Sequence, residues 1–105
     1  MTPNTTYYAV IFTANRTKNI DGYKEMSENL YSIAKDQPGF LGIESVEGDF
    51  EITISYWKDL NSITKWKSHP AHIEAQTLGA KSWHKDYKVK ITKVEREYTW
   101  EKSIS

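Results

Sequence analysis

The residues best suited to chemistry gather between Ser55 and Trp83, a stretch that holds three of the four tryptophans and two of the three histidines. Steps of three or four residues separate four of its side chains, Trp66, His69, His72 and Gln76. An indole beside imidazole and amide groups can bind a small aromatic molecule and exchange a proton with it. We therefore predict a ligand site here, in which Trp66 is either a core residue or a pocket wall.

The two histidines could also be metal ligands, but neither a third histidine nor a carboxylate stands at a supporting spacing. His69 precedes Pro70 and is better placed to cap a helix, whereas His72 is expected at a pocket rim or on the surface. His84 comes just before the last strand-like segment, and we expect it on the surface. The sequence therefore does not favour a metal site.

Asn15 and Arg16 are two further candidates, because they follow directly after a strand-like run at 7–14. An asparagine at a strand end serves a turn as readily as a site, and Arg16 either pairs with an acidic ligand group or is solvated. The sequence contains no cysteine, Gly-rich phosphate loop or nucleophile elbow. These absences argue against thiol enzymes, nucleotide-binding enzymes and serine hydrolases.

The first elements that must position these residues follow from hydrophobic periodicity. Residues 7–14, YYAVIFTA, predict a strand that is covered on both faces. Asp21 can cap a helix that stops before Pro38-Gly39. A single apolar stripe marks this helix, formed by Tyr23, Met26, Leu30, Ile33 and Ala34.

The second half of the chain predicts a hairpin, two short helices and a last strand. The hairpin strands are 40–47 and 50–57, and the second strand has an apolar face that reads as core: Phe50, Ile52, Ile54 and Tyr56. Asp59 can cap a helix whose buried face holds Leu60, Ile63 and Trp66. Pro70 can begin a further helix that Gly79 ends, and 87–92 predict a strand that reaches toward 96.

This order of elements predicts an α+β fold, the ferredoxin-like βαββαβ arrangement of an antiparallel sheet with helices on one face. We expect one domain over residues 1–105, with a core at 7–96 and a tail at 97–105 that packs on a partner subunit. Apolar side chains are expected on the sheet face without helices, namely Tyr7, Ile11, Trp57 and Val94. They predict a homodimer with apposed sheets, the alternative being a monomer with a half-exposed sheet.

Charge and hydropathy limit the partners. Fourteen basic residues balance fourteen acidic ones, so the net charge is zero. Nucleic-acid and anionic-membrane binders normally carry a basic excess, and both classes are therefore disfavoured. No run approaches the roughly 20 apolar residues of a membrane span, and the N-terminus lacks the pattern of a signal peptide. We expect a soluble, cytoplasmic protein.

Taken together, four segments resemble the antibiotic biosynthesis monooxygenase-like family of dimeric α+β barrel proteins: YAVIFTANRT, QPGFLGIES, ITISYWKDLNSITKWKSHPAHIEAQ and YKVKITKVER. The resemblance covers about residues 7–96. It implies a ferredoxin-like fold, a homodimer formed by apposed sheets, and a pocket between sheet and helices in each subunit. Some relatives oxygenate aromatic, polyketide-like substrates without flavin or metal.

The resemblance also suggests roles for single residues. A cofactor-independent monooxygenase of quinol- or anthrone-like substrates would use Trp66 as a wall and His72 as the base. Asn15 would act with them, and Arg16, His69 and Gln76 would bind the substrate. A related branch degrades haem with an Asn, a Trp and an axial His; the third position falls here on Gln76, an amide and a poor iron ligand, so haem is possible but disfavoured.

Three classes of function therefore remain open. The first is a cofactor-independent monooxygenase that acts on a small aromatic molecule. The second is a small-molecule-binding or stress-associated dimer without catalysis. The third is a haem-binding or haem-degrading monooxygenase.

Overall fold

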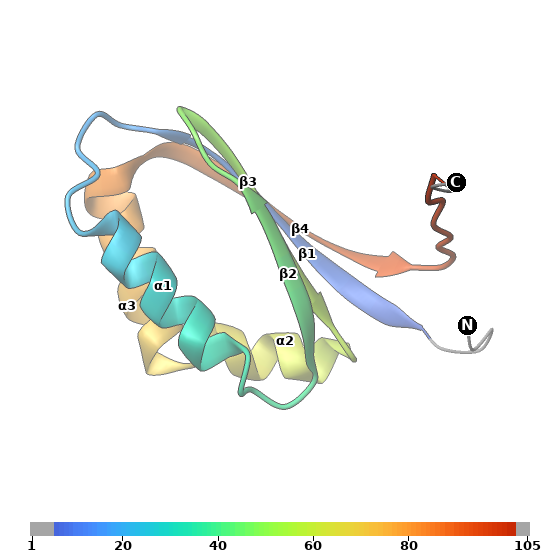
Figure 1. Ribbon diagram of the computed structural model, residues 1–105. Coiled ribbons are helices and arrows are strands. Elements are labelled where there is room, and N and C mark those ends of the chain that lie inside the picture. Colours follow the sequence, from blue (N-terminus) through green and yellow to red (C-terminus); the bar gives the residue numbers. More distant parts are fainter. Residues whose placement is uncertain (1–5, 103–105) are drawn as a thin grey trace.

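A computed structural model describes residues 6–102 and confirms the predicted α+β fold. The sheet has the order β2-β3-β1-β4, and all three pairings are antiparallel. Figure 1 shows the helices together on one side of the sheet. The elements run in the order β1 (Tyr7–Arg16), α1 (Tyr23–Ala34), β2 (Phe40–Val46), β3 (Phe50–Trp57), α2 (Leu60–Lys67), α3 (Pro70–Leu78), a π-helical turn η1 (Gly79–Trp83) and β4 (His84–Val94).

The structure reverses our assignment of the two faces of β3: the face that we expected to form the core points away from the helices. Trp57 is fully buried and Glu51 is 1% exposed, whereas Phe50 is 50% exposed. The face turned toward the helices therefore carries Glu51, Thr53, Ser55 and Trp57. Trp57 was expected on the uncovered face and lies beneath the helices instead. Its indole fits there because it packs edge to face on Phe40, with ring centroids 5.3 Å apart.

Polar caps fix the two short helices as the sequence predicts. Asp59 accepts from the Ser62 amide at 2.8 Å, and His69 Nδ1 accepts from the Ala71 amide at 3.0 Å. The backbone amides at these helix starts thereby gain partners. The expectation for Leu60 was wrong: this side chain is 51% exposed, because it lies in the first turn, outside the stripe that packs on the sheet.

Two helix boundaries differ from the prediction. The N-cap of α1 is Gly22 in the left-handed region, φ 80°, with no side-chain cap bond, so Asp21 does not cap this helix. At the other boundary, Gly79 has right-handed helical geometry and the chain continues into η1 rather than stopping. The extra turn lets the last strand begin at His84 instead of at residue 87.

The two ends of the described chain lie beyond the same end of the sheet, away from the helices (Figure 1). Residues 95–102 form neither helix nor strand, and Tyr98 and Trp100 are almost fully exposed. Within residues 6–102, none of the helices combines the length and apolar character needed to span a bilayer.

Gly39 offers a test of the turn that joins α1 to β2. Its φ is +83°, and a Cβ there would lie 2.6 Å from the Ser62 Cβ. We expect Gly39→Ala to lower the free energy of unfolding by about 1–3 kcal/mol. The positive φ is strained for alanine, and the new methyl group would collide with α2. Chemical denaturation measures this loss. Gly48→Ala is the matched control, since no atom lies closer than 3.7 Å to its added Cβ; equal losses in both variants would contradict the prediction.

Candidate functional site

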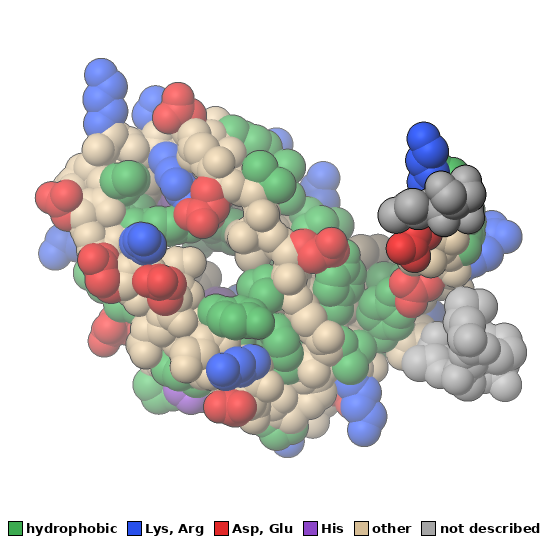
Figure 2. All heavy atoms as spheres, in the orientation of Figure 1, with side chains coloured by type: hydrophobic (Ala, Val, Ile, Leu, Met, Phe, Trp, Pro, Cys, Tyr) green, Lys and Arg blue, Asp and Glu red, His purple; other side chains and the backbone are tan. Residues whose placement is uncertain are grey.

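A cavity of about 330 Å³ lies between the sheet and the helices. Figure 2 shows the molecule hollowed at this place, with hydrophobic side chains around the opening. The walls are mainly apolar and aromatic, with Phe12, Phe40, Trp57 and Trp66 among the rings that line them. A cavity of this size and lining is typical of a small-molecule site.

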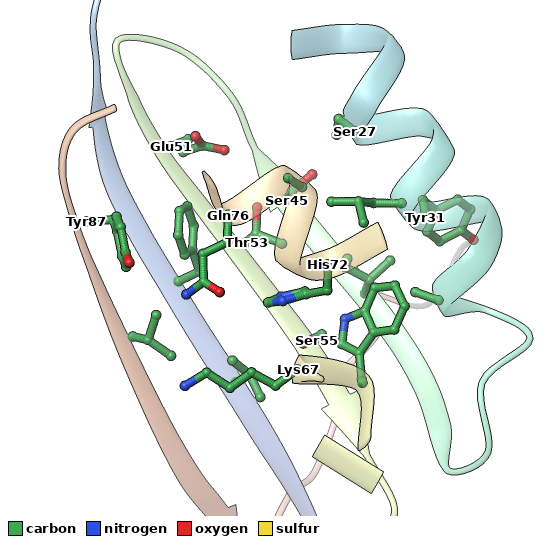
Figure 3. Close-up of a pocket in the computed structure, with 18 of the residues that line it drawn as sticks. Ser27, Tyr31, Ser45, Glu51, Thr53, Ser55, Lys67, His72, Gln76 and Tyr87 are labelled. Atoms are coloured by element: carbon green, nitrogen blue, oxygen red, sulfur yellow. The ribbon is translucent and has the colours of Figure 1, made fainter. Parts of the chain in front are cut away.

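One part of the cavity wall is formed by α2 and α3. His72 and Gln76 reach inward from successive turns of α3, above Ser55 and Thr53 of β3 (Figure 3). The His72 ring packs edge to face on Trp66, with centroids 5.4 Å apart. Trp66 in turn stacks on Trp57 at 6.2 Å. Trp66 is therefore a wall of the cavity, and an aromatic ligand could lie against these rings.

His72 is an imidazole without a polar partner. Its Nδ1 is buried and has no hydrogen-bond partner among residues 6–102. Burial lowers the pKa of His72 below its ordinary 6.5, and the charges of Lys67 and His69 lower it further. The ring is thus neutral at pH 7, and a neutral imidazole has one nitrogen that can accept a proton.

At another end of the cavity, Glu51 gathers side chains from three other elements. Tyr23 of α1 donates to its Oε2 at 2.5 Å, and His84 Nε2 of β4 lies 2.8 Å from Oε1. Arg16 of β1 donates to both oxygens at 3.5 Å and to Glu47 at 3.0 Å. The Arg16 guanidinium also lies 4.2 Å from the centre of the Tyr23 ring, a cation–π contact.

These contacts keep Glu51 ionised inside the protein. Burial raises the pKa of its carboxyl group, but hydrogen bonds from Tyr23, Arg16 and His84 outweigh burial and leave the pKa below its ordinary 4.5. For Tyr23, burial and then the bond to Glu51 raise the pKa well above 10. The phenol therefore keeps its proton, and the carboxylate keeps its charge.

The structure brings some of the predicted site residues together and separates others. Trp66, His72 and Gln76 line the cavity, and His69 packs on Trp66 with ring centroids 5.3 Å apart. Asn15 does not join them. It is exposed on the other face of the sheet, where its Nδ2 donates to Asp86 at 3.0 Å, because alternation along β1 turns it away from Ala14 and Arg16.

Arg16 binds acidic side chains of the protein itself, as part of the Glu51 cluster. Sequence reasoning missed the other members of this cluster. His84 was expected on the surface, yet its side chain is only 10% exposed. Glu51 lies on the face of β3 that was not expected to form the core. One feature of the sequence could have revealed the buried face of β3. Trp57 stands on the same face as Glu51, Thr53 and Ser55, and a large aromatic residue is unusual on a solvated face.

No group of three potential ligands among residues 6–102 is arranged to hold a metal ion. The donor set also does not fit haem. Gln76, which stands where the resemblance puts the axial ligand, offers only an amide, and the Nδ1 of His72 is buried.

A relative of known sequence covers almost the whole chain. It is YqjZ of Bacillus subtilis, an uncharacterized protein that is 42% identical over 106 residues, which are 99% of this chain and 93% of the relative. No family model matches the chain.

Solved structures share the fold at low sequence identity. SnoaB of Streptomyces nogalater, a cofactor-independent oxygenase, superposes with a TM-score of 0.74 at 10% identity, over 87% of this chain and 95% of SnoaB. An antibiotic biosynthesis monooxygenase superposes with a TM-score of 0.72 at 14% identity, over 81% of this chain and 95% of that protein. A conserved protein of Methanosarcina mazei Go1 superposes with a TM-score of 0.76 at 12% identity, over 86% of this chain and 94% of that protein. Likeness at this level of identity shows a common fold.

The buried carboxylate predicts how stability depends on pH. Because the pKa of Glu51 is lower in the folded protein than its ordinary 4.5, its contribution is fully present above about pH 4.5 and is lost as the pH falls through the folded value. We expect the melting temperature of the wild type to fall as the pH drops below about 4.5. Glu51→Gln should melt lower at pH 7 and lose less on acidification. Scanning calorimetry across this range measures both, and parallel curves for the two proteins would refute the assignment.

Proposed function

Because the chain belongs to the same family as YqjZ and has the fold of the antibiotic biosynthesis monooxygenase-like proteins, we propose that it is a cofactor-independent monooxygenase of a small aromatic substrate. The observation that carries this proposal is the neutral, unpartnered His72 beside Trp66 in an apolar cavity. A quinol- or anthrone-like molecule is the substrate class that suits both groups.

The reaction begins with a proton transfer. His72 takes the proton from an acidic O–H or C–H bond of the substrate, and the electron pair spreads into the aromatic system as an enolate or phenolate. Lys67, which reaches the cavity near His72 (Figure 3), places a positive charge near that anion. The apolar walls limit access of water, which strengthens this interaction.

Molecular oxygen is the second substrate and receives the electrons. The anion gives one electron to O₂, and the resulting substrate radical and superoxide combine to form a C–O bond. The peroxide then takes back the proton held on His72. At a CH₂ carbon, loss of water from the peroxide leaves a carbonyl, so one oxygen atom enters the product and the other leaves as water. The substrate supplies all the electrons, which is why no flavin or metal is required.

Oxygen uptake with an anthrone tests the proposal. We expect His72→Ala to slow uptake about 100-fold or more, since general base catalysis contributes at least that much. Glu74→Ala is the control, because this residue lies on the same helix and is exposed. An equal rate in His72→Ala and the wild type would refute the role of His72.

Asn15→Ala separates the sequence-based hypothesis from the structural one. An effect as large as that of His72→Ala would restore Asn15 to the site, although its side chain lies on the opposite face of the sheet and bonds to Asp86. Ligand-induced stabilisation without any oxygen uptake would instead favour a binding protein without catalysis.

The assembly we propose is a homodimer with the outer sheet faces packed together. That face carries Ile11 opposite Ile54 at its centre, the Tyr7–Tyr56 aromatic pair and Phe50 at one end. Apolar side chains thus occupy the middle strands of this face, and Glu44, Lys88 and Lys90 flank them; an apolar centre with a polar rim is typical of a protein–protein interface. Two subunits would cover each other's faces, and the exposed aromatic residues of the tail at 95–102 would lie at the rim of the contact.

We expect the wild type to sediment at about twice its 12.2 kDa. Ile54→Lys should sediment as a monomer, because a charge would then have to be buried in the centre of the interface. Ile73→Lys on α3, where the side chain is exposed, should remain dimeric. Analytical ultracentrifugation distinguishes these outcomes, and a monomeric wild type would contradict the proposal.

A further inference from the structure

The polar groups of the cavity lie at two ends that differ in charge. Figure 3 shows Lys67 at one end, near His72, and Glu51 at the other. The residues between them on β3, Thr53 and Ser55, also face the cavity. The two ends can therefore bind different groups of one ligand.

The strand sets the distance between these ends. Glu51 and Ser55 are four residues apart on β3, which corresponds to about 13 Å along an extended strand. A ligand that reaches from His72 to Glu51 is therefore longer than one aromatic ring. Its far ring would lie near the Tyr23–Glu51 pair.

Tyr23 is suited to accept a hydrogen bond from that ring. Its hydroxyl hydrogen is engaged with Glu51, Arg16 also approaches its oxygen, and the side chain lines the cavity. One lone pair of the phenol oxygen is then the group left for a ligand. A phenol that donates to a carboxylate is polarised and becomes a better acceptor.

The charges around Tyr23 favour a ligand group that donates a hydrogen bond and disfavour a negatively charged ligand group. Glu51 and Glu47 face the single guanidinium of Arg16, so two carboxylates share one arginine. A carboxylate or phosphate of a ligand would approach these groups in an apolar cavity and would be repelled. A neutral hydroxyl group would not.

We infer that the Tyr23–Glu51 pair is a specificity-determining position that accepts a hydrogen bond from a hydroxyl group on a substrate ring remote from the reacting one. Arg16 and His84 are positioning residues, because they hold Glu51 without needing to touch the ligand. The substrate is then a polycyclic aromatic molecule, with its acidic group toward Lys67 and His72 and a neutral hydroxyl toward Tyr23. This inference rests on the proposed function only in taking the cavity as the substrate site.

Binding of already oxidised ligands tests the inference without turnover. The probes are three anthraquinones: one with a hydroxyl group on each outer ring, one with a single hydroxyl group, and one with a carboxylate on each outer ring. For the wild type we expect the dihydroxy probe to bind about tenfold more tightly than the monohydroxy probe, and the dicarboxylate to bind most weakly. Fluorescence titration measures the three dissociation constants.

The chain offers a matched control on the opposite sheet face. Tyr56 donates to Glu44 at 2.6 Å there, in the same kind of pair as Tyr23 with Glu51. Tyr23→Phe should reduce the tenfold preference to less than about twofold, whereas Tyr56→Phe should keep it. We choose Tyr23→Phe rather than Glu51→Gln for this test. Tyr23→Phe removes only a hydroxyl group, so it can be measured even if Glu51→Gln fails to fold.

Two results separate the inference from the proposed function. If Tyr23→Phe melts cooperatively and keeps the full preference for the dihydroxy probe, the cluster only ties the elements together and the inference fails, whatever the oxygen uptake. If the preference is lost in Tyr23→Phe while the wild type consumes no oxygen, the inference stands and the monooxygenase proposal fails.

Discussion

The structure depends on keeping one carboxylate ionised although it is almost completely buried. A buried charge is costly unless donors from the protein replace water, and Glu51 obtains them from three elements besides its own strand: Tyr23 of α1, Arg16 of β1 and His84 of β4. These elements must therefore meet at one point. The helix layer is fixed to the sheet at this end by polar bonds, so it does not need a filled apolar core beneath it.

That attachment explains how so small a domain can be hollow. Few side chains are completely buried, and the largest of them is Trp57. Its indole, with Trp66 stacked over it, forms a wall rather than a filling, because large rings span the gap between the layers without closing it. The same emptiness leaves His72 without a polar partner. A tightly packed interior would have excluded such a group or supplied a partner for it.

The sequence predicted those features that depend on local spacing. The order of the elements, the Asp59 and His69 caps and the place of Trp66 follow from periodicity and capping chemistry, which act over a few residues. The faces of β3 could not be assigned in this way. Alternation shows that two faces differ, but not which one meets the helices. The usual rule of polar residues outside assumes a filled core and a solvated outer face, and here the polar face, with Glu51, lines a cavity.

The position of His84 depends on an extra residue in a strand. The register between β1 and β4 shifts at Asn15 and Arg16, so that Asn15 pairs with Asp86 while Arg16 pairs with His84. Bulges of this kind re-aim side chains and depend on both strands, so neither strand alone reveals them. Without the shift, the residue opposite Arg16 would be Lys85, and a second cation would stand where an imidazole now binds Glu51. One added residue in β4 thus decides whether a lysine or an imidazole stands beside Glu51 at this end of the cavity.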